Sequence, residues 1–325
     1  MPLPEPALTA MTMTKSRGAP GNVLVIYRKQ LGDLLLLQPA LQLLSERFDA
    51  PIRVCTRAGF ADLLQLMPGD IALASNSSRD IRQVYCFDSK ASTLRDALYC
   101  WPNKRTLILT RPERVWWHKF FFHEILTAGN RDDYRARMFQ QTLGGTEFSP
   151  PTLNAPPLDW LPDGIPQNYI VVHPTSAWRR KTWPAENWIA VLNELHSQIP
   201  WPLVITAGNE SWEREMADAI ASNINGGALN LAGQTSLRNY LAVLAGANAV
   251  LCVDGSASHI AAAFGRPTLT LFGPTKQAHW HYATARSKGL SAADFTVERK
   301  PPVAAIPVAA VFAAARQLLD SSLND

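Results

Sequence analysis

Short apolar runs recur along the chain and are separated by stretches with helical spacing. The first run, Val23–Tyr27, is followed by a helical pattern over Leu34–Phe48, with Pro39 near its first turn. Apolar runs of this length are typical of strands that are buried on both faces of a parallel sheet. Because runs and helical stretches alternate, the pattern predicts an α/β chain with parallel sheets.

The same alternation places the remaining elements. In the first half, strands are expected at Ile52–Cys55, Gln83–Phe87 and Thr106–Thr110, and helices near Phe60–Leu66 and Thr93–Cys100. In the second half, strands are expected at Tyr169–His173, Leu203–Ala207, Leu229–Leu231, Ala249–Val253 and Thr268–Phe272. The helices between and after them are expected at Pro184–His196, Trp212–Ala221, Leu237–Leu244, His259–Phe264 and Pro307–Asp320.

A proline-rich stretch divides the two series. Six prolines lie between Phe148 and Gln167, which is the composition of a linker. We therefore expect one β/α domain over residues 22–160, a second over 161–305 and a C-terminal helix over 306–325. Residues 1–21 have no apolar core behind basic residues, so we expect a disordered tail and neither a secretion signal nor an anchor.

Composition narrows the function classes. The formal net charge is +4 and its surplus lies in the first 160 residues, which suits anionic partners but is far from a nucleic-acid-binding signature. The four cysteines form no Cys-x-x-Cys pair, so we expect no metal site and no disulfide framework. No stretch approaches the roughly 20 apolar residues that span a bilayer. We expect a cytoplasmic protein whose membrane contact, if any, is peripheral.

Candidate chemistry follows the ends of the predicted strands. Gly32 and Asp33 come after the first strand, where Asp33 is either a helix cap or a general base in an interdomain cleft. After the first strand of the second domain, Arg179, Arg180 and Lys181 form either a solvated charge run or a phosphate clamp. Thr175 and Ser176 lie in the same loop.

A third strand end carries small residues that open a helix. Asp254, Gly255 and Ser256 would leave backbone N–H groups free to hold a phosphate. Asp254 is a helix cap or a ribose ligand, and His259 is a packing residue or a phosphate ligand. The turn at Gly273 should face the same crevice, because ligands of open α/β sheets bind at the carboxyl ends of the strands.

These strings, in this order, resemble glycosyltransferase family 9, the ADP-heptose:lipopolysaccharide heptosyltransferases, and most of all the heptosyltransferase III branch. The matching strings are Arg28 with Leu31-Gly32-Asp33, the Pro-Thr…Lys-x-Trp-Pro of 174–184, Gly208-Asn209-Glu210, Leu231-Ala232-Gly233 with Thr235, Asp254 with Ser258-His259 and the alanines after them, and Pro267 with Leu271-Phe272-Gly273.

The resemblance implies a GT-B fold of two Rossmann-like domains, the first binding the acceptor and the second the nucleotide sugar. It implies an inverting transfer of heptose from ADP-heptose to the lipopolysaccharide inner core, without metal or other cofactor. Asp33 would be the base, and Lys181 would neutralise the donor phosphates. The other implied donor contacts are Thr175, Ser176, Arg179, Arg180, Glu210, Asp254, Gly255, Ser256, His259 and Gly273.

One position departs from the family and several functions stay open. Gly255 stands where the family usually has Ser or Thr, which leaves the donor-sugar contacts undecided. The alternatives are a member with another donor or acceptor, a nucleotide-sugar epimerase, and a non-catalytic nucleotide-binding scaffold. A dehydrogenase is disfavoured because no Gly-x-Gly-x-x-Gly follows the first strand.

The segment 111–137 is both aromatic and basic. Arg114, Trp116, Trp117 and Lys119 belong either to a core helix with basic flanks or to a surface that docks on a phosphorylated lipid-linked acceptor or on the inner membrane. Arg28 is a further candidate acceptor contact. The partners expected are therefore a nucleotide sugar and this acceptor, and no nucleic acid.

Overall fold

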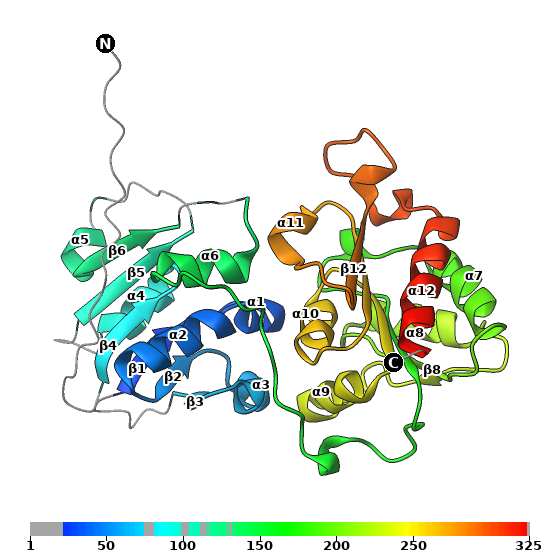
Figure 1. The fold of residues 1–325 in the computed structure, drawn as a ribbon, viewed down its shortest axis with the longest axis horizontal. Helices are drawn as coiled ribbons and strands as arrows, with labels where there is room; N and C mark the ends of the chain where they lie inside the picture. Colours follow the sequence, from blue (N-terminus) through cyan, green and yellow to red (C-terminus); the bar gives the residue numbers. More distant parts are fainter. Residues whose placement is uncertain are drawn as a thin grey trace.

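The fold consists of two α/β domains side by side (Figure 1). A computed structural model describes residues 22–74, 81–98, 104–110, 116, 118–128, 130 and 132–323. The predicted N-terminal tail lies outside these residues. No helix in the described residues is long and apolar enough to cross a membrane.

Each domain is built on a six-stranded parallel sheet. The first contains β1 (Asn22–Ile26), β2 (Ile52–Cys55), β3 (Ile71–Leu73), β4 (Ile81–Cys86), β5 (Lys104–Leu109) and β6 (Glu124–Thr127). The second contains β7 (Ile170–His173), β8 (Leu203–Ile205), β9 (Leu229–Asn230), β10 (Ala249–Val253), β11 (Thr268–Phe272) and β12 (Ser287–Ser291).

Both sheets have the Rossmann strand order. The first runs β3-β2-β1-β4-β5-β6 and the second β12-β11-β10-β7-β8-β9, which is the same order within its own domain. The order reverses between β1 and β4 in the first sheet and between β7 and β10 in the second. A ligand crevice forms at such a reversal, beyond the carboxyl ends of the strands. The predicted fold class, two Rossmann-like domains of the GT-B type, is confirmed.

Helices cover the sheets and meet between the domains. Those of the first domain are α1 (Leu31–Leu35), α2 (Gln38–Phe48), α3 (Ala61–Leu66), α4 (Ala91–Leu98), α5 (His118–Phe121) and α6 (Arg135–Thr142). Those of the second are α7 (Ala185–His196), α8 (Ser211–Ala221), α9 (Leu237–Gly246), α10 (Ser256–Ala263), α11 (Gln277–Trp280) and α12 (Val308–Leu323). Figure 1 shows α1 facing α10 across the domain boundary, and these two helices are in contact.

The first predicted helix is wrong in one respect. The pattern over Leu34–Phe48 suggests a single helix, but α1 ends at Leu35 and α2 begins at Gln38. Pro39 explains the break, because it has no N–H to continue a helix and occupies the first turn of α2. The break lets α1 point at the second domain while α2 stays on the first sheet.

The two domains share one apolar core. A single cluster of buried side chains includes Leu34 and Leu64 of the first domain together with Leu241 and Ile260 of the second. Two further clusters lie on the opposite faces of the sheets, one in each domain. The shared cluster brings α1 against α10 and α3 against α9, so the strand ends of both sheets converge on one cleft.

Candidate active site

A cavity of about 810 Å³ lies between the domains at the carboxyl ends of the strands. The first domain contributes the β1–α1 loop with Asp33, and also Arg57 and Phe60. The second domain contributes the loops after β7, β8, β9 and β10. The volume falls within the usual size range of cofactor and small-molecule sites, about 300–1,000 Å³.

Asp33 lies in the first turn of α1 and faces this cavity. Its Oδ2 accepts a hydrogen bond from the backbone N–H of Gln30 at 3.2 Å, so it does cap the helix. Burial raises the pKa of the carboxyl, opposed by that hydrogen bond and by the charges of Lys29 and Lys181. Capping occupies one oxygen and leaves the other available to the cleft, so the two interpretations of this residue are compatible.

Lys181 enters the cavity from the opposite domain. Its Nζ lies 2.7 Å from Oδ2 of Asp254, and the two side chains are 15% and 3% exposed. Thr275 donates to the same Oδ2 from its Oγ1 at 2.6 Å. Because the buried carboxylate is paired and hydrogen-bonded, it can hold the ammonium group in one place. A cation that is fixed in the cavity lining suits a phosphate ligand.

The N-terminus of α10 lies beside this pair. Gly255 precedes the helix, Ser256 begins it, and both line the cavity. The first N–H groups of a helix have no partner within the helix and attract anions. His259 lies one turn further on, and burial lowers its pKa to about 4, so the ring is neutral near pH 7.

Helix α1 approaches α10 closely at Gly32. A Cβ atom at this position would lie 2.8 Å from Cδ2 of His259 and 3.3 Å from Cα of Ser256. The absence of a side chain at Gly32 therefore sets the distance between the two helices. Asp33, the next residue, is held against the N-terminus of α10 by this contact.

The loops after β7 and β8 add a buried hydroxyl group to the cavity lining. Thr175 is fully buried, and its Oγ1 has no hydrogen-bond partner in the described residues. Beside it, Nδ1 of His173 lies 2.9 Å from Oγ1 of Thr206. An unpaired buried hydroxyl costs free energy, which a bound ligand can recover.

The acidic residue of α8 that lines the cavity is Glu213, whereas the sequence pattern pointed to Glu210. Glu210 is the exposed N-cap of α8, and its backbone N–H donates to Oε2 of Glu213 at 3.4 Å. The Glu213 carboxylate occupies the space where a side chain at Gly208 would lie. The Glu-x-x-Glu spacing of a capping box was the available signal, since the second acid of such a box turns back toward the loop.

The structure brings together eight of the candidate residues and separates five others from them. The cavity is lined by Asp33, Thr175, Ser176, Lys181, Asp254, Gly255, Ser256 and His259. It is not lined by Arg28, Arg179, Arg180, Glu210 or Gly273. The lining also includes residues that were not site candidates, among them Arg57, Tyr240 and Trp280.

The residues outside the cavity have local partners instead. Arg28 forms an ion pair with Asp96 at 2.6 Å, and the Arg179 guanidinium stacks 5.0 Å from the ring centroid of Trp212. Gly273 lies against Val303, where a Cβ would not fit. The basic loop is a short 3₁₀ turn over Arg179–Lys181, in which Lys181 alone lines the cavity.

The aromatic segment lies at the outer edge of the first domain, at α5 (Figure 1). Trp116 is 72% exposed and Phe120 63% exposed, and their rings meet edge to face. The Lys119 ammonium lies 5.6 Å from the ring centroid of Phe120. Arg114 and Trp117 lie outside the described residues. Trp116 and Lys119 do not line the cavity, so we assign them no contact with the reacting groups.

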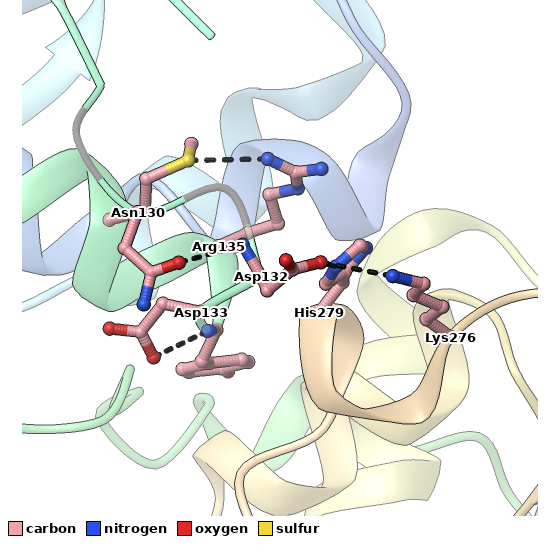
Figure 2. A network of polar contacts seen from close by, with 8 residues as sticks. Asn130, Asp132, Asp133, Arg135, Lys276 and His279 are labelled. Atoms are coloured by element: carbon pink, nitrogen blue, oxygen red, sulfur yellow. Dashed lines mark hydrogen bonds and ion pairs between the residues drawn. The ribbon is translucent and has the colours of Figure 1, made fainter.

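A polar contact joins the domains at the rim of the cleft (Figure 2). Oδ1 of Asp132, just before α6, lies 3.0 Å from Nζ of Lys276 and 3.3 Å from Nε2 of His279 on α11. The hydrogen bond from Lys276 lowers the pKa of Asp132. Next to it, the ring of Tyr134 packs against that of Tyr282 with centroids 5.6 Å apart. The exposed ion pairs contribute little to the free energy of the contact between the domains. The packed rings therefore contribute more to holding the domains together at this edge.

The two facing Rossmann-like domains and the cleft between them define a protein of the GT-B fold. A carboxylate from one domain and a cation with a helix N-terminus from the other face a single cavity. In the described residues, no group of three or more His, Cys, Asp and Glu side chains is placed to hold a metal ion.

Comparison with known proteins gives the family. The sequence model for glycosyltransferase family 9 (heptosyltransferase) matches residues 135–300, just over half of the chain. The chain belongs to this family and is a glycosyltransferase. Lipopolysaccharide heptosyltransferase 3 of Escherichia coli is 26% identical over 230 residues, which cover 65% of this chain and 66% of that protein, just under two thirds of its length.

Solved structures agree on the fold. The glycosyl transferase family 9 protein of Veillonella parvula has a TM-score of 0.79 at 16% identity and covers 93% of this chain and 98% of its own. The E. coli heptosyltransferase WaaC, solved with ADP, has a TM-score of 0.70 at 16% identity, with 93% and 99% covered.

Proposed function

We propose that this protein transfers a heptose from ADP-heptose to the lipopolysaccharide inner core with inversion at the anomeric carbon. The observation that carries the proposal is that Asp33 and Lys181, from opposite domains, line one cavity. The names of the E. coli relative and of WaaC with ADP support the donor and the acceptor class. We further propose that no metal takes part.

The reaction is a single displacement. Asp33 accepts the proton of the acceptor hydroxyl as its oxygen attacks the anomeric carbon. The bond between that carbon and the diphosphate oxygen breaks on the opposite face, which inverts the configuration. Lys181 and the backbone N–H groups at the start of α10 stabilise the negative charge that develops on the leaving diphosphate. Because a nucleoside diphosphate leaves readily with this help, one carboxylate is sufficient.

The remaining lining residues orient the donor. Glu213 accepts hydrogen bonds from the ribose hydroxyls, and Thr175 donates its unpaired hydroxyl to the nucleotide. Gly255 has an extended backbone, and a Cβ there would meet Cβ of Ser176 at 3.7 Å and the carbonyl oxygen of Val253 at 3.9 Å, which are ordinary contact distances. The position therefore has room for the Ser or Thr usual in the family, and we propose that Ser256 takes the hydroxyl's place.

We also propose that the exposed aromatic residues at α5 hold the protein at the cytoplasmic face of the inner membrane. Trp116 and Phe120 would lie in the interfacial layer and Lys119 on anionic headgroups. Lys119→Glu should then weaken co-sedimentation with vesicles that contain acidic lipid, whereas Lys300→Glu, at an exposed position outside this segment, should not. Equal co-sedimentation of the two variants would remove this part of the proposal.

The donor site is tested by calorimetric titration with ADP, UDP and GDP. We expect selective ADP binding, which Lys181→Met weakens by about 10- to 100-fold because a charge-assisted contact is lost. Lys300→Met is the matched control. Selective binding of UDP or GDP would support a transferase with a different donor, and binding of none would overturn the proposed donor site.

The base is tested with ADP-heptose and an inner-core acceptor. Asp33→Asn should lower kcat by about 10²- to 10⁴-fold, the usual contribution of a general base, and leave ADP affinity unchanged. Asp294→Asn, at an exposed position outside the cavity, is the control. Release of free sugar without acceptor would instead identify an epimerase.

A further inference from the structure

A second cavity of about 390 Å³ lies between the domains beside the first. His259 and Trp280 line both cavities, so the two sites are neighbours. Leu36, Tyr134 and the prolines 150–151 form the wall on the side of the first domain. The volume falls within the range of small-molecule sites, about 300–1,000 Å³.

The second cavity follows α10 away from the donor site. Its lining includes His259 near the start of the helix and Arg266 just beyond its end. Arg266 lies three residues beyond Ala263, the last residue of α10. The loop before β12, with Tyr282 and Arg286, forms the opposite side.

The far end of this cavity is positively charged. Arg266 and Arg286 line it from two different elements, and none of the described residues in its lining is acidic. Nε of Arg266 is buried and has no hydrogen-bond partner in the described residues. A single arginine near a helix C-terminus stabilises the helix dipole without a ligand. Two arginines from separate elements, with a buried donor unpaired, favour an anion instead.

The walls between the two ends suit a saccharide. Two aromatic residues, Trp280 and Tyr282, and two hydroxyl residues, Thr284 and Ser287, are among those that line the cavity. Aromatic walls with a few polar groups are typical of small-molecule sites. A ligand that reaches from Asp33 past His259 to Arg266 must be longer than the transferred sugar alone.

We propose that this second cavity binds a phosphate group carried by the acceptor saccharide, away from the hydroxyl that attacks the donor. Arg266 and Arg286 hold the phosphate, and Trp280 and Tyr282 contact the sugar rings in between. This inference rests on the proposed function, because it takes the acceptor to be an oligosaccharide. Since both domains line the cavity, the bound acceptor contacts both.

The test is calorimetric titration of the full chain, without ADP, with a deacylated inner-core oligosaccharide. The phosphorylated form and its phosphatase-treated form are compared. We expect the phosphorylated form to bind at least about tenfold more tightly, as charge-assisted contacts to a guanidinium predict. Arg266→Gln should remove this difference and leave the separate titration with ADP unchanged. The control is Arg316→Gln, on α12, where the arginine pairs with Asp320.

A second variant keeps the proposal testable if Arg266→Gln proves unstable. Ala262 is an exposed position on α10 in the lining of the cavity, so Ala262→Trp fills the cavity and should also weaken oligosaccharide binding. Equal affinity of the two oligosaccharide forms for the unaltered protein would overturn the proposal. So would binding of inorganic phosphate at Arg266 that does not compete with the oligosaccharide. Loss of ADP selectivity alone would bear on the proposed function and not on this cavity.

Discussion

At the scale of single residues, two features of its surroundings shift the pKa of Asp33 in opposite directions. The Gln30 N–H stabilises its charged form, whereas burial in the cleft favours the neutral form and raises its pKa. A base in the proposed reaction must be charged, so activity must fall as pH falls through this raised pKa. The pH at which the rate falls on the acidic side of the profile therefore measures the pKa of Asp33 in the cleft.

Removing a nearby cation should move that pH. Lys29 lowers the pKa of Asp33 and does not line the cavity, so Lys29→Gln should shift the acidic limb of kcat/KM to higher pH and leave the plateau unchanged. The measurement is a pH–rate profile from about pH 4 to about pH 8, which spans the range of carboxyl and imidazole titration. Lys288→Gln, on β12, is the control. A shift to lower pH, or none, would contradict Asp33 as the base.

The sequence indicates those site residues that lie directly after a strand. Asp33, Lys181 and Asp254 could be found because the carboxyl ends of parallel strands meet at one edge of a sheet. Glu213 was missed although the Glu-x-x-Glu spacing was a signal for it. Trp280 could not be placed, because its direction depends on the phase of a helix and on the neighbouring domain. Arg179 and Arg180 could not be distinguished from Lys181, because a 3₁₀ turn sends consecutive side chains in different directions.

At the scale of elements, the contact between α1 and α10 couples the two halves of the site. Gly32 and His259 meet at this contact. Gly32 directly precedes the proposed base, and His259 lies one turn from the proposed phosphate site at the start of α10. The sequence placed Gly32 after the first strand but did not predict this contact, because the break at Leu36–Leu37 that aims α1 at α10 was not expected. Three short edge strands, β3, β6 and β12, were missed for a related reason: they have three to five residues and no strong apolar run.

Enlarging Gly32 should separate the base from the donor. In Gly32→Ala the new Cβ displaces α1 from α10, and a misplacement of about 1 Å can cost about 100-fold in rate. We expect kcat to fall by that order while the ADP dissociation constant is little changed, because the proposed function places ADP on the second domain. Gly59→Ala is a matched control, since a Cβ there meets no atom within 4 Å. Unchanged kcat in Gly32→Ala would show that the contact does not position Asp33.

At the scale of the whole molecule, the proline-rich linker is not what unites the domains. Leu64, Leu241 and Ile260 belong to one buried cluster that crosses the boundary. Arg238 of α9 also pairs with Asp62 of α3 at 2.8 Å, although this pair is partly exposed and adds little. The composition of this stretch predicted a linker between two separate domains, but the apolar contact predicts that the domains unfold together.

Calorimetry tests this cooperativity. We expect one unfolding transition, and we expect Leu64→Ala to lower the free energy of unfolding by about 2–5 kcal/mol, as for other buried leucines. Hydrogen exchange should show that amides of β8, in the second domain, lose protection together with those of β4 in the first. Two separate transitions, or loss confined to β4, would show that the domains are independent.

The shared core also limits how such enzymes can recombine. If one gene supplied the acceptor half and another the donor half, the encoded chimera would have to join surfaces that normally fold as one interior. Mismatched leucines and alanines at α1, α3, α9 and α10 would leave holes or clashes where Leu34, Leu64, Leu241 and Ile260 now pack. A new donor specificity should therefore be grafted as loops after β7, β8 and β10, and not by exchange of whole domains.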